Sequence, residues 1–224
     1  DSFFVPDRRG YYFDLINNKK AISLLFTRGC HEKCTFCSIA SYIKLCGGAR
    51  WRPRSPAAVA DEIEFLMRTT GIKKFDFVDD NFLGPSEIER EKCFHLSEEI
   101  IKRKLDIRFS VTSRVDGVNY ELFETLKKAG LVEITLGIES WSDTQLKRYN
   151  KKVKREEIIR AIDILDGLGI DYKCFLLPLD PYVTREEIMD NLDMMEKHRP
   201  QDHVIIYSHF WRKIRLDPYL PLFR

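Results

Sequence analysis

Short apolar runs alternate along the chain with longer stretches in which apolar residues recur every three or four positions. The short runs have the length of buried strands, and the longer stretches have the period of amphipathic helices. A predicted helix separates each predicted strand from the next. The six predicted strands are residues 21–27, 75–78, 107–111, 133–138, 172–177 and 204–207.

Several predicted helices carry sequence signals at their ends. Ser55 followed by Pro56 is typical of an N-cap and a first helical position, and Gly71 suits the end of that helix. Asn119 is a second predicted N-cap, and a capping box opens at Thr184. A linker rich in Lys and Arg follows the fourth predicted strand. The apolar positions expected on the buried helix faces are Val59, Ile63 and Leu66; Leu96 and Ile100; Leu122, Phe123 and Leu126; Ile158, Ile162 and Leu165; and Ile188, Leu192 and Met195.

Strands that alternate with helices predict a parallel sheet, because each helix crosses back over the sheet before the next strand begins. The crossovers are expected to be right-handed. Six strand–helix units are fewer than the eight of a closed barrel, so the expected α/β fold is a partial (β/α)6 TIM-like barrel, a curved parallel sheet with outer helices. The alternative is a doubly wound open sheet, but the first loop lacks the G-x-G-x-x-G pattern of that fold.

One core domain is expected. Residues 21–210 are predicted to form the partial barrel, and residues 211–224 are an extension without a strong period. Residues 1–20 are expected to be a lead-in or linker segment. They do not form a complete fold by themselves, so the chain is expected to start partway through a longer protein. A length of 224 residues is enough for one sizeable α/β core.

Composition is that of an ordinary globular protein, with 44% hydrophobic and 32% charged residues. The formal net charge of +2 gives no support for a polyanion-binding surface, so nucleic acid is not an expected partner. The basic segment at residues 50–56 is too short to change this, and its arginines are expected to be solvated. No apolar run reaches the length of a membrane span and no signal peptide begins the chain, so a cytoplasmic location is expected.

Three of the six cysteines, Cys30, Cys34 and Cys37, have the spacing C-x3-C-x2-C in the loop after the first predicted strand. So short a loop can aim three thiolates at one point, which suits three corners of a 4Fe–4S cluster and leaves one iron without a protein ligand. The alternative is a zinc site of three cysteines and a histidine, but zinc sites usually consist of two separated ligand pairs. The scattered cysteines fit a reduced compartment better than a disulfide framework, and Cys93 and Cys174 are expected in the core.

Polar side chains recur where the predicted strands end. In parallel barrels the carboxyl ends of the strands form one rim, and chemistry takes place there. Such a polar rim suits a zwitterionic nucleoside ligand. The polar residues that follow the six strands are Cys30, Cys34 and Cys37; Asp79, Asp80 and Asn81; Ser113 and Arg114; Glu139 and Ser140; Asp180; and Tyr207, Ser208 and His209.

The cysteine motif after a first strand, with Phe36 directly before the third cysteine, resembles the radical S-adenosylmethionine (radical SAM) superfamily. The resemblance covers residues 22–209 and implies the (β/α)6 fold. It also implies an enzyme in which the open iron binds SAM, and SAM is reductively cleaved to a deoxyadenosyl radical that takes a hydrogen atom from a small-molecule substrate. Reduced flavodoxin or ferredoxin is the implied electron donor.

This resemblance implies SAM contacts along the rim. Residues 79–81 stand where the family has Gly-Gly-Glu, the segment that binds the SAM amino group, and this departure leaves the donor open. Arg114 is expected to hold the SAM carboxylate as a two-bond fork, and Glu139 resembles a fourth-strand residue that contacts the ribose or the amino group. Without the resemblance, residues 79–81 could be a turn with a helix cap, and Arg114 a surface ion pair. The expected SAM contacts are Phe36, Asp79, Asp80, Asn81, Ser113, Arg114, Glu139 and Ser140.

Three segments, at residues 50–56, 78–82 and 112–116, together resemble the cobalamin-dependent branch of the superfamily. The branch implies an N-terminal cobalamin-binding domain and cobalamin-dependent methylation or related C–C chemistry. Neither that domain nor a D-x-H-x-x-G cobalamin motif is in these residues. The alternatives are a cobalamin-independent radical SAM enzyme, such as a methylthiotransferase, and a metal-binding structural or electron-transfer module that is not an enzyme.

Overall fold

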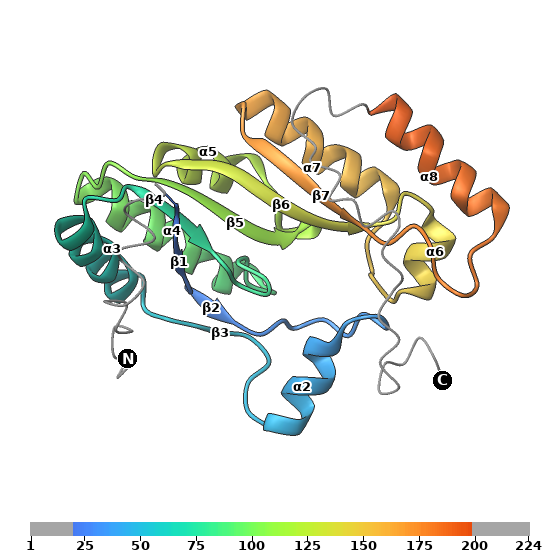
Figure 1. The fold of residues 1–224 in the computed structure, drawn as a ribbon, viewed down its shortest axis with the longest axis horizontal. Helices are drawn as coiled ribbons and strands as arrows, with labels where there is room; N and C mark the ends of the chain where they lie inside the picture. Colours follow the sequence, from blue (N-terminus) through green and yellow to red (C-terminus); the bar gives the residue numbers. More distant parts are fainter. Residues whose placement is uncertain (1–19, 199–224) are drawn as a thin grey trace.

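A computed structural model of the chain describes residues 20–198. Five parallel strands form one sheet, and a short antiparallel ribbon lies beside it (Figure 1). The ribbon pairs β2 (Thr27–Arg28) with β3 (Arg52–Pro53). The strands of the sheet, in order across it, are β1 (Ile22–Leu24), β4 (Lys74–Phe77), β5 (Arg108–Arg114), β6 (Leu131–Glu139) and β7 (Asp171–Leu176).

The order of the five strands across the sheet is also their order along the chain. Each crossover therefore steps in the same direction, and right-handed crossovers place every crossover helix on one face. A doubly wound sheet reverses its strand order partway across, so that alternative is wrong. The expected α/β partial barrel, a parallel sheet with outer helices, is confirmed. The predicted strand at residues 204–207 and the rim residues after it lie outside the described residues.

Helices α3, α4, α5 and α7 contact one another in sequence along the outer face of the sheet, and α2 stands apart from this layer (Figure 1). The predicted caps are present, because the side chains of Ser55, Asn119 and Thr184 each accept a backbone N–H in the first turn. The helices are α2 (Ser38–Cys46), α3 (Pro56–Thr70), α4 (Glu87–Lys102), the 3-10 turn η1 (Val115–Gly117), α5 (Tyr120–Lys128), α6 (Asp143–Arg148), α7 (Arg155–Leu168) and α8 (Arg185–Lys197).

The hydrophobic core lies between the sheet and this helix layer. Phe77 packs edge-on against Phe82 and Phe109, with ring centroids 5.4 and 5.5 Å apart. The apolar stripes predicted for α3, α4, α5 and α7 are buried in this core, and so are Cys93 and Cys174, as predicted. Burial of these stripes supplies most of the free energy that fixes the helices on the sheet.

The buried face of helix α8 differs from the predicted one. Its buried side chains include Glu187 and Asn191, whereas Leu192 is 41% exposed. The reason is a polar contact, since Asn191 Oδ1 accepts the backbone N–H of Trp141 at 2.7 Å. Hydrogen bonding of buried backbone therefore helps to orient this helix, together with the packing of Met194 and Met195 against the core.

The segment from Trp51 to the start of α3 is less solvated than its sequence predicts. Trp51 is buried and donates its Nε1–H to the carbonyl of Asn81 at 2.9 Å. Arg54 forms an ion pair with Glu62, with Nη1 2.7 Å from Oε2. The expectation of solvated arginines is therefore wrong for Arg54, because α3 brings a carboxylate beside it.

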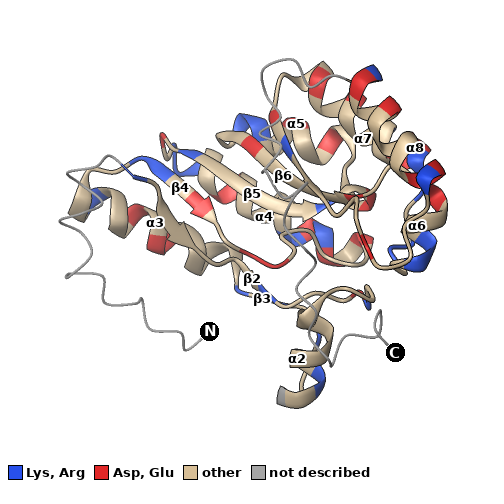
Figure 2. Cartoon of the chain, turned by 45° about the vertical axis from the view of Figure 1, so that its right-hand side comes forward, with Lys and Arg blue, Asp and Glu red and all other residues tan. Residues whose placement is uncertain are grey.

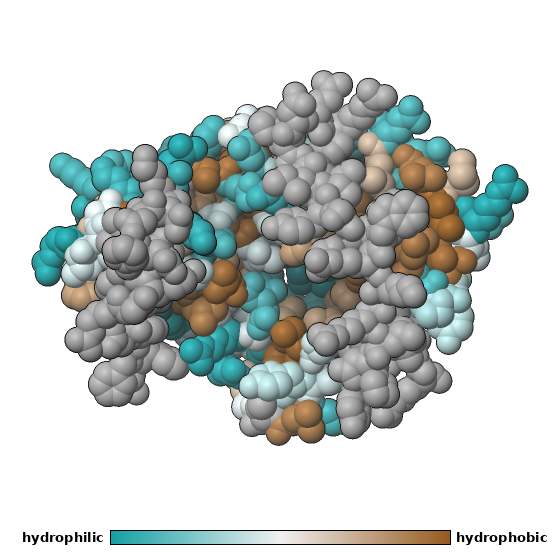
Figure 3. All heavy atoms as spheres, in the orientation of Figure 1, coloured by the Kyte–Doolittle hydropathy of each residue, from teal (hydrophilic) through white to brown (hydrophobic). Residues whose placement is uncertain are grey.

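Side chains of different character are mixed on the surface of the described residues. Lys and Arg are interspersed with Asp and Glu along α3, α6, α7 and α8 (Figure 2). Hydrophilic and hydrophobic residues are likewise interspersed on the face shown in Figure 3. Within residues 20–198, no helix combines the length and the apolar character that a bilayer crossing requires.

Candidate functional site

The three predicted cluster cysteines lie in the loop that joins β2 to α2. Cys34 is buried, Cys30 and Cys37 are partly exposed, and Cys37 occupies the N-cap position of α2. Burial raises the pKa of both Cys34 and Cys37, and the neighbouring sulfur raises it further in each case, Cys37 acting on Cys34 and Cys30 on Cys37. The three sulfurs therefore share one electrostatic environment, in which thiolates need a bound cation or metal.

A close backbone approach shapes the start of this loop. Gly29 has φ +84°, and a Cβ on it would lie 2.2 Å from the carbonyl oxygen of Arg50. The N–H of Gly29 donates to Asp80 Oδ2 at 3.0 Å. Only glycine fits this left-handed, crowded position, so the approach to Cys30 is fixed by Gly29, Arg50 and Asp80 together.

Asp79 ties the end of β4 to the same segment. One of its carboxylate oxygens accepts the backbone N–H groups of Phe26, at 3.0 Å, and of Thr27. Burial raises the pKa of Asp79 to about 6, although these hydrogen bonds lower it. The predicted SAM contacts Asp79 and Asp80 thus lie at the base of the cysteine loop and hold its backbone.

The segment after α6 holds the other side of the cysteine loop. Thr35 donates its backbone N–H to the carbonyl of Tyr149 at 3.0 Å, and Asn150 Nδ2 donates to the carbonyl of Lys33 at 2.9 Å. The ring of Phe36 packs edge-on against Tyr149, with centroids 5.2 Å apart. These contacts span more than 110 residues of chain, so the fold of α6 and the geometry of the loop depend on each other.

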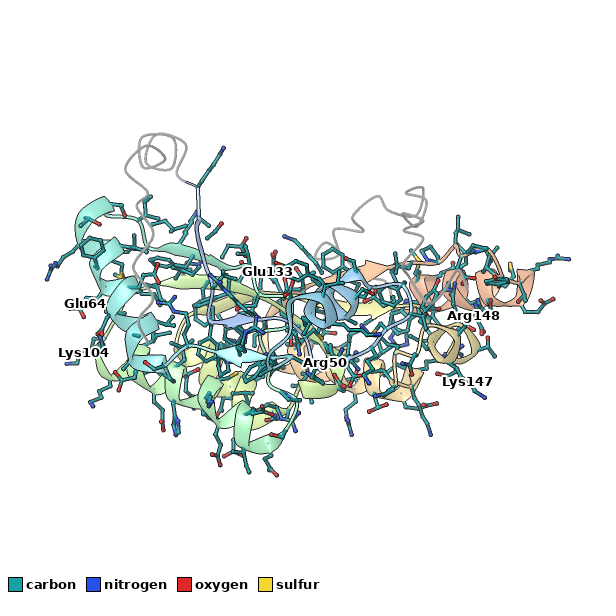
Figure 4. The ribbon with its side chains drawn as sticks, turned by 90° about the horizontal axis from the view of Figure 1, so that it is seen from below. Arg50, Glu64, Lys104, Glu133, Lys147 and Arg148 are labelled. Atoms are coloured by element: carbon teal, nitrogen blue, oxygen red, sulfur yellow. The ribbon has the colours of Figure 1, made fainter. Side chains whose placement is uncertain are left out.

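Residues 143–148 were expected to be part of a basic linker, but they form helix α6, and its last residue, Arg148, pairs with two carboxylates. Arg148 Nη2 lies 2.8 Å from Asp180 Oδ2 and 2.7 Å from Glu187 Oε2. Burial raises the pKa of Asp180, but hydrogen bonds from Arg148 hold it below its ordinary value. Asp180, predicted as a rim residue, thus faces α6. Figure 4 shows Arg148 at this end of the molecule, away from Arg50 beside α2.

A buried ion pair lies at the end of β6. Glu139 Oε1 is 2.9 Å from Lys151 Nζ, and both side chains are almost fully buried. Glu139 has φ +66° and sits where the β6–β7 register shifts, a strained conformation that is typical of functional sites. The pair needs the missing side chain of Gly137, because a Cβ there would lie 2.8 Å from Glu139 Oε1. Lys151 was not predicted, since it lies in a basic run that reads as solvated.

Arg114, predicted to bind the SAM carboxylate, has most of its donors engaged. Nε and Nη2 donate to the carboxylate of Asp116, at 2.9 and 2.8 Å, and Nη2 also donates to the carbonyl of Lys151 at 2.8 Å. Nη1 lies 3.8 Å from Cys34 Sγ. Four of the five guanidinium N–H groups are therefore used. Contact with SAM stays a prediction, but the expected two-bond fork is not available in this arrangement.

The other predicted contacts are buried and have protein partners. Asn81 Oδ1 accepts from Ser113 Oγ at 2.8 Å and from the backbone N–H of Arg114 at 3.3 Å. Ser140 Oγ donates to Gln145 Oε1 at 2.6 Å. These side chains join neighbouring loops of the rim, and their contacts with SAM stay predictions.

The cysteine loop has the donors and the unfilled polar atoms of a site that takes a further group. Three buried atoms there, His31 Nδ1, Arg50 Nε and Asp79 Oδ2, have no hydrogen-bond partner among the described residues. In residues 20–198, no three His, Cys, Asp or Glu side chains form a site for a single metal ion. In a cubane cluster each cysteine binds a different iron, so Cys30, Cys34 and Cys37 stay the predicted cluster ligands.

Comparison with known proteins gives matches over most of the chain. The Radical SAM superfamily matches residues 24–195. Anaerobic magnesium-protoporphyrin IX monomethyl ester cyclase of Rubrivivax gelatinosus is 32% identical over 161 residues, which are 71% of this chain and 27% of that protein. 4'-phospho-dehydrooxetanocin synthase of Priestia megaterium is 27% identical over 197 residues, covering 79% of this chain and 26% of that protein.

Comparison with solved structures also gives radical S-adenosylmethionine enzymes. The cobalamin-dependent S-adenosylmethionine radical enzyme OxsB with aqua-cobalamin bound has a TM-score of 0.72 and 25% identity, and the match covers 85% of this chain and 28% of that one. The radical S-adenosylmethionine methyltransferase TsrM from Kitasatospora setae has a TM-score of 0.74 at 21% identity, covering 91% and 36%, and supports the fold. The chain thus spans about a quarter to a third of the length of these relatives.

Proposed function

This chain belongs to the radical SAM superfamily of enzymes, and we propose that it binds a 4Fe–4S cluster through Cys30, Cys34 and Cys37 and SAM at the fourth iron. The observation that carries the proposal is the cysteine loop itself, in which three sulfurs share one environment beside unpartnered buried polar atoms. When bound, the cluster supplies the electron that cleaves SAM into methionine and a deoxyadenosyl radical.

The chain's own part in this chemistry is to hold the loop and to orient SAM. We assign the first task to Asp79 and Asp80, which bind the backbone ahead of Cys30. Asn81, Ser113 and Ser140 hold the rim loops against one another. Rigid support of this kind keeps reacting groups in a productive geometry.

The second task falls to the buried charges around the end of β6. The Glu139 carboxylate can accept N–H or O–H donors from the amino group or the ribose of SAM. Lys151, held beside it, offers the opposite charge to the carboxylate, and the opposed pair matches the zwitterion. Phe36 and the remaining N–H of Arg114 complete the SAM-facing set of this proposal.

Cobalamin-dependent methylation, or related C–C chemistry, is the reaction we propose for the full-length protein. Support comes from OxsB, a cobalamin-dependent enzyme that matches 85% of this chain. The cobalamin would be bound by another domain, and reduced flavodoxin or ferredoxin in the cytoplasm would supply the electron. A methylthiotransferase is the second candidate, since tRNA-2-methylthio-N(6)-dimethylallyladenosine synthase of Christiangramia forsetii is 26% identical over 207 residues. Cobalamin binding by the full-length protein separates the two.

Anaerobic reconstitution tests the proposed function. We expect a 4Fe–4S cluster in each chain and formation of deoxyadenosine that requires both SAM and a reductant. Cys34→Ala should abolish both, and Cys93→Ala, a change at a cysteine buried in the core, should keep both. Stoichiometric zinc in place of iron, or undiminished deoxyadenosine formation by Cys34→Ala, would contradict the proposal.

A further inference from the structure

A guanidinium group lies against one of the three cluster cysteines. Arg114 Nη1 is 3.8 Å from Cys34 Sγ, within the range of an N–H···S hydrogen bond, and the two residues are only 5% and 8% exposed. At a buried position a full positive charge acts strongly on its neighbours, because water screens it little. Arg114 is therefore placed to affect any charge that forms at the Cys34 sulfur.

The guanidinium group is held at this place by two groups that do not belong to the cysteine loop, and a third holds the Arg114 backbone. Asp116 accepts two of its N–H groups, and the carbonyl of Lys151 accepts a third at 2.8 Å. The backbone N–H of Arg114 donates to Asn81 Oδ1 at 3.3 Å. Burial raises the pKa of Asp116, but the hydrogen bonds and the charge of Arg114 hold it below its ordinary value, so the Asp116 carboxylate is ionised.

Cys34 differs from its neighbour Cys37 in the hydrogen bond that its sulfur receives, whereas the charge of Lys151 acts on both sulfurs. The Cys37 sulfur receives a backbone N–H from Ile39, an interaction that the turn of α2 supplies without any particular side chain. Cys34 instead meets a charged side chain that comes from the end of β5, 80 residues further along. A backbone N–H carries no net charge, whereas Arg114 brings both a hydrogen bond and a full positive charge.

We propose that Arg114 is a positioning residue that sets the reduction potential of the cluster through Cys34. The proposal rests on the cluster of the proposed function. Reduction adds an electron, and the added negative charge is stabilised by a nearby cation and by hydrogen bonds to the sulfur ligands, which raise the potential. Asp116 and the Lys151 carbonyl keep the guanidinium at the sulfur, and Arg114 thereby makes the cluster easier to reduce.

The test is a redox titration of the reconstituted protein, followed by EPR of the reduced cluster. Arg114→Gln removes the charge and the fork, and its midpoint potential should fall below that of the wild type. Arg114→Lys keeps a charge but cannot keep all four hydrogen bonds, so its midpoint potential should lie between those of the wild type and Arg114→Gln. Arg103→Gln is the matched control, because Arg103 binds Asp61 and Glu99 on the outer helices and should leave the potential unchanged.

A second readout follows from the same shift. At a fixed solution potential, a smaller fraction of the cluster should be reduced in Arg114→Gln than in the wild type, and a stronger reductant should restore it. Wild-type potentials in both loaded Arg114 variants would overturn the proposal. Loss of the cluster from both variants with an unchanged circular dichroism spectrum would also overturn it, since Arg114 would then be needed for assembly. Failure of the wild type to bind iron would instead contradict the proposed function.

Discussion

Lys151 Nζ lies 2.9 Å from Glu139 Oε1, and only 4% and 10% of the two side chains are exposed. Lys151→Met would leave the Glu139 carboxylate buried without its partner, which costs about 3–5 kcal/mol of unfolding free energy. Urea denaturation of the metal-free protein measures this loss. The double variant Lys151→Met with Glu139→Gln should recover part of it, because the uncompensated charge is removed.

An exposed ion pair is the control for this prediction. Lys128 and Glu124 lie 2.8 Å apart on α5, with side chains 62% and 42% exposed. Lys128→Met should change the unfolding free energy by less than about 1 kcal/mol. Equal effects of Lys151→Met and Lys128→Met would show that burial does not matter to the Glu139–Lys151 pair.

Gly29→Ala should prevent the cysteine loop from closing on Arg50. The added Cβ would lie 2.2 Å from the Arg50 carbonyl oxygen at φ +84°, so the loop must move and cluster loading should be largely lost. Gly71→Ala is the control, since Gly71 has φ +71° and open space around its Cβ position, and it should cost only about 1 kcal/mol. Iron content after anaerobic reconstitution distinguishes them, and full loading of Gly29→Ala would contradict the close approach.

Asp79 should make the stability of the metal-free protein depend on pH. Its pKa in the folded state is raised by burial to about 6, above the ordinary 3.8, so the folded state binds this proton more tightly. The contribution is therefore fully present below pH 4 and is lost as the pH rises through 6. Relative to Asp79→Asn, the unfolding free energy of the wild type should rise by up to about 3 kcal/mol as the pH is lowered from 7 to 4. Urea denaturation at each pH measures this, and unfolding free energies of the two proteins that change in parallel with pH would refute it.

Asn150→Gly should remove a contact that holds the cysteine loop in place. It should not strain the backbone, because Asn150 has φ +50° and glycine accepts that conformation. It removes the hydrogen bond to the carbonyl of Lys33, worth about 1 kcal/mol, so a chelator should extract iron roughly fivefold faster. Lys104→Gly, at φ +54° after α4, is the control and should leave that rate unchanged. Equal rates for both variants would mean that the hydrogen bond from Asn150 to Lys33 does not hold the loop.

Local signals in the sequence predict much of this fold. The stripe of Val59, Ile63 and Leu66 identifies a helix on a sheet because its period is a property of the helix itself. The caps at Ser55 and Asn119 identify where helices start, since the capping residue and its N–H lie three residues apart. Such features can be recognised without knowing which distant residues they contact in the fold.

The site contains features that local signals cannot predict. Lys151 lies next to Lys152 and Asn150 in the segment after α6, and its burial depends on Glu139 at the end of β6. Arg114 has the chemistry of a ligand-binding residue, but Asp116 and Lys151 occupy most of its donors. Helix α6 has six residues, too few to display a period, and it is fixed by Asp180 and Glu187 further along the chain.

The most direct measurement of the central claim is the EPR spectrum of the reduced, reconstituted protein with and without SAM. A cluster held by only Cys30, Cys34 and Cys37 has one iron that the amino and carboxylate groups of SAM can bind, so SAM should shift the g values. Adenosine lacks those groups and should leave the spectrum unchanged. A spectrum that is identical with and without saturating SAM would contradict a cluster with an open iron.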